Sequence, residues 1–312
     1  MTALSVRARR LGASRGPRVA AALAAALMAT LTGAAASQPA QASQLAPIYP
    51  VQAAFASPGP YATTTGTVTD ATGTVIYDVF RPSDYAALGF ESPIVTWGNG
   101  TGASPAKVSD FLSQLASHGF TVIASTLPNT GSGNEIDDAA HYLVTQNGVA
   151  TSVFHGHLNT GEVAAVGTSQ GATGAVRAAT NDPALIKAVM TFSLPNSVWS
   201  GPNPDCPTAA DCTANPAALT QPAFFVSTYG FWDSIIASPA TEKAYFLSTS
   251  VHAALGTILT SDGKLADHTS IQDAAVGGNP GGFLGYATAA AAFTGAHPEL
   301  VSNANWPGSA AK

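Results

Sequence analysis

Short apolar runs alternate along the chain with segments in which apolar residues recur every three or four positions. Apolar runs bounded by glycine and polar residues indicate strands, whereas apolar residues at helical spacing indicate amphipathic helices. The runs are residues 73–80, 93–97, 120–125, 162–167, 186–192, 223–228 and 255–260. Strands that alternate with helices need crossover connections. The pattern therefore predicts an α/β fold with a mostly parallel central sheet and helices on both of its faces.

Helical periodicity occupies the segments between and after these runs. The segments are residues 107–119, 134–148, 172–181 and 283–295. In the first, Phe111, Leu112 and Leu115 fall on one face, and Gly119 supplies the stop signal. Residues 195–221 form the longest stretch without periodicity. A loop of this length inside a compact domain is usually functional or mobile.

The N-terminal segment has the pattern of an export signal. Five arginines, from Arg7 to Arg18, precede an apolar run at residues 19–31. Ala40 and Ala42 then place small residues at the two positions that signal peptidase reads. The apolar run is too short and too rich in alanine to favour a membrane span, so we expect a cleaved signal peptide; an uncleaved anchor is the alternative.

Removal of this leader makes the chain more acidic. The leader holds five of the 12 basic residues and none of the 18 acidic ones, so cleavage takes the formal net charge from −6 to −11. Such a protein is a poor partner for nucleic acid or an anionic membrane surface. About 270 residues remain, enough for one large domain. The expected organisation is a signal peptide at 1–42, an irregular lead-in at 43–60 and a single secreted domain at 61–312.

The two cysteines, Cys206 and Cys212, lie close together in a loop rich in Pro, Asp and Ala. In an exported chain this spacing favours a disulfide bond. The closed loop is short, so the bond contributes about 2 kcal/mol on the loop-entropy model. No histidine lies nearby to complete a ligand set, so we expect no metal there.

The segment from Gly167 to Gly171 reads G-T-S-Q-G and fits the pattern G-x-S-x-G. The pattern alone is weak evidence, but here a predicted strand precedes it and a predicted helix follows. This context is that of the nucleophile elbow of α/β-hydrolases, where small neighbours let strand and helix approach and the helix N-terminus lends positive potential to the serine. Ser169 is therefore the candidate nucleophile, and a purely structural turn is the alternative.

A serine hydroxyl is a weak nucleophile and needs a base, which follows the serine and an acid in the chain order of this fold. His268 lies just beyond the last predicted strand, so it should reach the same edge of the sheet as Ser169. His252 lies before that strand, at the opposite edge, and His297 lies after the last predicted helix. We expect His268 to be the base.

The acid that orients this histidine is expected to be Asp233, which follows the predicted strand at 223–228 and so reaches the same edge. Asp205 and Asp211 lie in the cysteine loop, with no strand to aim them. Asp262 and Asp267 lie close to His268 in the sequence, which usually gives a poor geometry for orienting it. We expect Asp267 to be a solvated loop acid.

A tetrahedral intermediate needs backbone N–H donors. One should come from Gln170, directly after the nucleophile, and the other from the glycine-rich loop after the strand at 93–97. Thr101 is the expected second donor, with Gly100 or Asn99 as alternatives. A phosphate cradle in this loop is disfavoured, because no lysine stands where a P-loop would place it.

With these residues in place, the chain resembles the secreted bacterial polyester hydrolases and cutinase-like esterases of the dienelactone-hydrolase and chlorophyllase group. The similar segments are residues 111–125, 162–179, 227–235 and 264–270. The resemblance implies an α/β-hydrolase fold with Ser169, Asp233 and His268 as the triad, and Gln170 and Thr101 as oxyanion donors.

Some positions depart from that family. Gln170 stands where the family has methionine, and Leu194 and Pro195 stand where it has a tryptophan that clamps an aromatic substrate; Trp199 comes several residues later. These departures leave the hydrolase chemistry intact and put polyester activity in question. The candidate walls of a substrate pocket are aromatic: Trp97, Tyr229, Phe231 and Trp232.

The sequence thus predicts a secreted, metal-independent and cofactor-free serine ester hydrolase that forms an acyl-enzyme and acts on a small-molecule or polymeric ester. We expect a monomer, although the sequence leaves the oligomeric state open. Two alternatives remain at this point. One is a non-catalytic binding protein on a hydrolase scaffold, and the other is an amidase or acyltransferase that uses the same triad.

Overall fold

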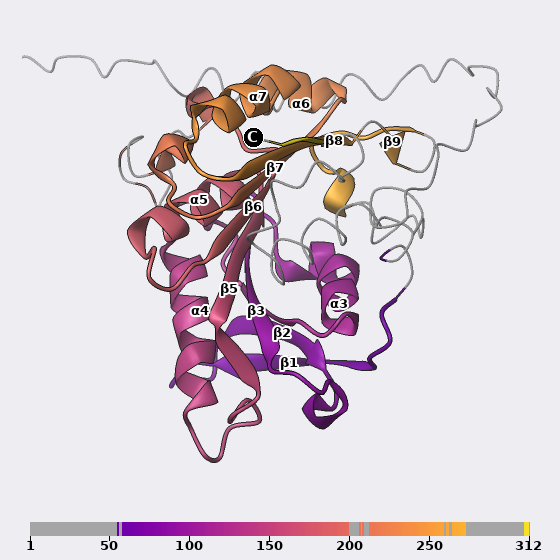
Figure 1. The fold of residues 1–312 in the computed structure, drawn as a ribbon, viewed down its shortest axis with the longest axis vertical. Helices are drawn as coiled ribbons and strands as arrows, with labels where there is room; N and C mark the ends of the chain where they lie inside the picture. The colour runs from indigo at the N-terminus through magenta and orange to yellow at the C-terminus, as the bar shows by residue number, and fades with distance from the viewer. Residues whose placement is uncertain are drawn as a thin grey trace, which may run out of the picture. The chain divides into compact units, whose positions relative to one another are not determined.

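The apolar runs of the sequence become the central strands of a sheet in the computed structural model, which describes residues 55, 58–199, 206, 208, 212–258, 260–261, 264–272 and 309–311. Within these residues one nine-stranded sheet has the order β1-β2-β4-β3-β5-β6-β7-β8-β11 (Figure 1). The strands are β1 Thr63–Thr69, β2 Val75–Pro82, β3 Ser92–Gly98, β4 Thr121–Ser125, β5 Leu158–Thr168, β6 Ala188–Phe192, β7 Ala223–Thr228, β8 Ala253–Ile258 and β11 Ser309–Ala311. A separate small hairpin pairs β9 Thr260–Ser261 with β10 Lys264–Leu265.

The centre of the sheet is parallel and its margins are antiparallel. β3 pairs in parallel with β4 and β5, and the parallel pairing continues through β6, β7 and β8. β1, β2 and β11 pair antiparallel with their neighbours. The carboxyl ends of the parallel strands therefore meet at one edge of the sheet, where open α/β sheets place their ligand sites. The α/β fold predicted from the sequence is confirmed.

Helices cover both faces of this sheet. The α-helices are α3 Ser109–Ser117, α4 Asn134–Asn147, α5 Gln170–Asn181, α6 Phe231–Ile236 and α7 Pro239–Ser248. Short 3-10 helices span Tyr85–Ala87, Pro105–Val108, Ser197–Trp199 and Pro216–Ala218. Figure 1 shows α3 on one side of the strands and α4 with α5 on the other. Among the described residues, no helix is long and apolar enough to cross a membrane.

Two hydrophobic cores follow from the alternation of side chains along each strand. On β3, Val95 and Trp97 face the core under α3, whereas Ile94 faces the core under α4 and α5. Val122 and Ile123 on β4 divide in the same way. Strands that are buried on both faces have nearly continuous apolar sequences, which is why they could be predicted.

Some elements were not predicted. β1 has a mixed, mostly exposed sequence, TTTGTVT, and forms the outer strand of a hairpin with β2, so it lacks an apolar run. α6 and α7 follow directly on β7 in a segment without helical periodicity long enough to detect. The last predicted strand, 255–260, is shifted and is β8 Ala253–Ile258. The helix predicted at 283–295 and the leader at 1–42 lie outside the described residues.

Candidate active site

Ser169 lies between β5 and α5 in a backbone conformation that is unusual for a residue with a side chain. Its φ is 54°, in the left-handed region, and its N–H donates to Phe192 O at 2.9 Å. The turn is tight because glycines line it. A Cβ on Gly167 would lie 2.2 Å from the Gly171 carbonyl oxygen, and one on Gly171 would lie 2.1 Å from Gly98 O. No side chain fits in either place.

Three side chains from different elements meet at this turn. His268 Nε2 lies 2.8 Å from Ser169 Oγ, and His268 Nδ1 lies 2.6 Å from Asp233 Oδ1. Ser169 follows β5, Asp233 is on α6 directly after β7, and His268 follows the hairpin after β8. The structure therefore places the three residues expected from the sequence in one hydrogen-bonded row, the Ser169–His268–Asp233 cluster.

Asp233 is fully buried, and donors surround its second oxygen. Oδ2 accepts from Ser193 Oγ at 2.6 Å, from Thr228 N at 3.2 Å, and from Thr228 Oγ1. Hydrogen bonds from such donors offset the free-energy cost of removing a carboxylate from water. With Oδ2 held in this way, Oδ1 is aimed at the imidazole. Ser193 and Thr228 were not singled out from the sequence, because a serine and a threonine at strand ends carry no distinctive pattern.

Asp267, expected to be a solvated loop acid, has a structural role instead. Its carboxylate accepts from the backbone N–H groups of Trp232 at 3.2 Å, Asp233 at 3.0 Å and His268 at 2.8 Å. It ties the start of α6 to the histidine loop. That expectation is corrected: Asp267 accepts hydrogen bonds from the backbones of both Asp233 and His268 and so fixes their relative positions.

The other candidates lie elsewhere. His252 precedes β8, and its carbonyl accepts from Ala223 N at the start of β7, so it lies at the opposite edge from Ser169. Asp205, Asp211, Asp262 and His297 lie outside the described residues.

The expected oxyanion donors lie on two sides of Ser169. Gln170 is the first residue of α5, so its N–H is among the first four of the helix, which have no partner within it. On the other side, a Cβ on Gly100 would lie 3.4 Å from Ser169 Cβ. Thr101 is exposed in a turn where Ala103 N donates to Gly100 O. Gly100 in this loop therefore lies close to Ser169.

The predicted aromatic walls divide into an exposed and a buried group. Tyr229, Phe231 and Trp232 are 60%, 65% and 38% exposed and directly precede Asp233 in the chain. Trp199, 51% exposed, joins them by donating from Nε1 to Ile235 O on α6 at 3.2 Å. Trp97 is fully buried.

The prediction that Trp97 lines a substrate pocket is therefore wrong. Its ring packs against those of Phe111 and Phe192 in the core under α3, and its Nε1 donates to Asn99 Oδ1 at 3.1 Å. A tryptophan on a central strand of a covered sheet points into one of the two cores. The neighbouring residues in the sequence do not show whether such a side chain lines a pocket or packs in the core.

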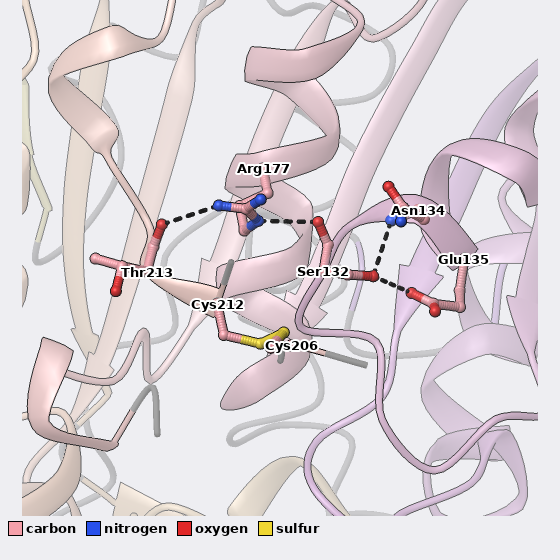
Figure 2. The surroundings of a disulfide bond; sticks show 7 residues. All are labelled: Ser132, Asn134, Glu135, Arg177, Cys206, Cys212 and Thr213. Atoms are coloured by element: carbon pink, nitrogen blue, oxygen red, sulfur yellow. Dashed lines mark hydrogen bonds between the residues drawn. A yellow bond between two sulfur atoms is a disulfide. The ribbon is translucent and has the colours of Figure 1, made fainter. Parts of the chain in front are cut away.

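The disulfide bond between Cys206 and Cys212 is confirmed, with the two Cα atoms 5.4 Å apart. Both cysteines are buried, and Figure 2 shows the bond beside Arg177, whose guanidinium bridges Ser132 O at 2.9 Å and Thr213 O at 3.4 Å. A Cβ on Gly131 would lie 3.0 Å from Cys212 Sγ and 2.6 Å from Gln170 Cγ. The bond thus packs beside the residue that follows Ser169.

One group of possible metal ligands occurs among the described residues, and it shares no residue with the Ser169–His268–Asp233 cluster. His141 Nε2 lies 3.0 Å from Asp182 Oδ2 and 3.7 Å from Asp137 Oδ2. Burial raises the pKa of Asp137, and the nearby His141 partly offsets this increase. The hydrogen bond from His141 accounts for the contact with Asp182 without an ion.

The chain matches a known protein family. A family model described as "PETase: PET hydrolase-like" matches residues 37–225, a range that contains β1–β6, the turn at Ser169, the cysteine loop and the first half of β7. No curated protein matches the chain.

Proposed function

This chain belongs to the PET hydrolase-like family, and on that premise we propose that it is a secreted serine ester hydrolase with Ser169, His268 and Asp233 as its catalytic triad. The observation that carries the proposal is the row of hydrogen bonds from Ser169 Oγ through the imidazole to the buried Asp233 carboxylate. Family membership supports a hydrolase that acts on esters, and the row of hydrogen bonds supports the serine mechanism.

The proposed reaction has two halves. Ser169 Oγ attacks the ester carbonyl while His268 Nε2 takes its proton, and Asp233 stabilises the imidazolium that forms. The Gln170 N–H and an N–H of the Gly100–Thr101 loop stabilise the oxyanion. His268 then gives the proton to the departing alcohol, which leaves an acyl group on Ser169. A water molecule, deprotonated by His268, releases the acid and restores the serine.

The proposed substrate is a small-molecule or polymeric ester with an apolar acyl or alcohol part. The support is a group of exposed aromatic side chains: Tyr229, Phe231 and Trp232 shortly precede Asp233 in the chain, and Trp199 is hydrogen-bonded to Ile235 O on the same helix as Asp233. Aromatic side chains of this kind bury apolar surface at little cost in conformational entropy. The leader at residues 1–42 and the disulfide bond support secretion.

The test is hydrolysis of p-nitrophenyl esters of increasing acyl length by the mature protein and by Ser169→Ala and His268→Gln. We expect turnover of at least one ester by the wild type, and a loss of roughly 10³-fold or more in kcat for each variant. The chain-length profile separates a short-chain esterase from a lipase.

His252→Gln is the matched control, because it changes a histidine at the opposite edge of the sheet. It should keep kcat within about twofold of the wild type. If no ester is turned over, or if Ser169→Ala is as active as the wild type, the proposed mechanism is wrong and a binding role on this scaffold becomes the better explanation.

A further inference from the structure

A second carboxyl group lies buried behind Asp233. Glu242 on α7 is fully buried, and its Oε1 accepts from Leu194 N at 2.5 Å. Its Oε2 has no hydrogen-bond partner among the described residues. The proposed reaction does not use Glu242, and a buried carboxyl group is costly unless it has a role.

The segment that Glu242 contacts, Ser193–Asn196, begins with a residue in a strained conformation. Ser193 has a φ of 52°, and with Ser169 it is one of the two non-glycine residues with positive φ in the described part of the chain. Such a conformation persists only where neighbouring groups enforce it. One such neighbour is on β7, where Val226 O accepts from Ser193 N at 2.8 Å. The others are on α6 and α7: Glu242 accepts from Leu194 N, Tyr245 Oη donates to Pro195 O at 2.9 Å, and Asn196 N donates to Ile236 O at 3.0 Å.

This segment and the residue before it contact two members of the proposed triad. Ser193 Oγ donates to Asp233 Oδ2 at 2.6 Å. Phe192, the residue before it, accepts from Ser169 N at 2.9 Å. A shift of the Ser193–Leu194 peptide would therefore reach the acid through the Ser193 hydroxyl and the nucleophile through Phe192 O.

The protonation state of Glu242 follows from what faces it. Asp233 faces it from α6, Leu194 N–H faces it from the strained segment, and Tyr245 lies one turn along α7. Burial, and then the charge of Asp233, raise the pKa of Glu242 well above its ordinary value, while the single N–H lowers it. A neutral carboxyl group still accepts a hydrogen bond through its carbonyl oxygen, and it adds no negative charge beside Asp233.

We propose that Glu242 is a positioning residue of the ester hydrolase: it holds the Ser193–Leu194 peptide, and through it the Asp233 carboxylate and the Ser169 turn. The inference rests on the proposed function, since it concerns the same triad. In this role Glu242 touches neither the substrate nor the reacting atoms. Replacing it should therefore change kcat and the pH profile more than KM.

The experiment compares Glu242→Gln and Glu242→Leu on an ester that the wild type hydrolyses. Glutamine keeps a neutral acceptor for Leu194 N–H, so kcat should stay within twofold, and the acid-side fall of kcat/KM should keep its pH midpoint. Leucine removes the acceptor, so kcat should fall tenfold or more with KM changed less than twofold. Ser193→Ala combined with Glu242→Leu should lose little beyond the larger single effect, because both act through one path.

Phe246→Leu is the control for general destabilisation, because Phe246 packs in the core from the same helix, one turn further on. It should lower the unfolding midpoint while kcat, measured where the variant is folded, stays near the wild type. If Glu242→Leu behaves like this control, the positioning role is overturned. If Glu242→Gln moves the acid-side midpoint to lower pH, Glu242 carries a charge in the working enzyme, and the neutral form is overturned.

Ser169→Ala separates the two proposals. If wild type and Ser169→Ala show the same hydrolysis, the proposed function fails before Glu242 is tested. If hydrolysis depends on Ser169 and both Glu242 variants retain full kcat, only the positioning role fails.

Discussion

Two non-glycine residues have positive φ among the described residues: Ser169, which belongs to the proposed triad, and Ser193, which contacts it through Asp233. Ser169 and Ser193 have φ values of 54° and 52°. A side chain in this region costs of order 1 kcal/mol or more, so surrounding contacts must hold it. For Ser169 the contact is Phe192 O. For Ser193 the contacts are Val226 O and Asp233, and Glu242 holds the next N–H in the chain, that of Leu194. The strain orients two hydroxyl groups, one toward His268 and one toward Asp233.

Glu242 should make the protein less stable as the pH rises. Burial raises its folded-state pKa well above the ordinary 4.5, so above that pH the folded protein keeps a proton that the unfolded chain releases. The stability that this bound proton contributes is fully present below the pKa of Glu242 in the unfolded chain and is lost as the pH rises through its pKa in the folded protein. Over that range the free energy of unfolding falls by up to about 1.4 kcal/mol per pH unit. Urea unfolding at several pH values measures this slope.

Glu242→Gln is the reference for that slope, since glutamine does not titrate. The free energy of unfolding of the variant minus that of the wild type should increase with pH above 4.5. Parallel curves for the two proteins would mean that Glu242 has the same pKa folded and unfolded, and the prediction would be wrong.

The junction of β5 and α5 depends on three glycines, of which only two belong to the G-x-S-x-G pattern. Gly167 and Gly171 belong to the pattern, but Gly174 on α5 is as tightly enclosed, because a Cβ there would lie 1.9 Å from Thr130 O. All three meet backbone atoms, which cannot move aside as a flexible side chain could. The helix therefore lies closer to β3 and the 130–133 loop than any other residue would allow.

Gly171→Ala should destabilise the protein by about 3 kcal/mol and abolish most ester hydrolysis. Its Cβ would lie 2.1 Å from Gly98 O and 2.6 Å from Asn99 O, so either α5 or the chain at Gly98–Asn99 must move. Urea unfolding and kcat measure the two effects.

Gly66→Ala is the matched glycine control, because an added Cβ there meets no atom within 4 Å. It should leave activity unchanged and stability equal or slightly higher, since alanine in a strand costs less conformational entropy than glycine. A Gly171→Ala protein as stable and active as this control would show that α5 can adjust, contrary to the prediction.

Across the molecule, parallel pairing brings distant residues to one edge. β5, β7 and β8 each end at that edge, and the turns that follow them supply Ser169, Asp233 and, after the hairpin, His268. Order along the chain therefore determines which aspartate and histidine can reach the serine. The same argument excludes His252, at the start of β8.

At the scale of the whole chain, we predict cleavage of the leader after Ala42 during export. N-terminal sequencing of the secreted protein should begin at Ser43. Ala42→Phe should block processing, because signal peptidase needs a small residue at that position, whereas Gln41→Leu, at the neighbouring position that it does not read, should be processed normally. A secreted protein that keeps residues 1–42 would favour the uncleaved anchor.

The sequence by itself determined the features that depend on near neighbours. Strand and helix periods, the glycines around Ser169 and the order of serine, acid and histidine are local or linear properties, so the α/β fold and the three candidate residues could be predicted. The cysteine spacing was informative for the same reason.

Only the tertiary structure decided what depends on contacts between distant segments. It placed Trp97 in the core, gave Asp267 a role in tying α6 to the histidine loop, and brought Ser193 and Glu242 behind Asp233. None of these residues differs in its local pattern from an ordinary core, loop or helix residue. Their roles arise from which donors face which acceptors once the sheet has formed, and residues far apart in the sequence supply those partners.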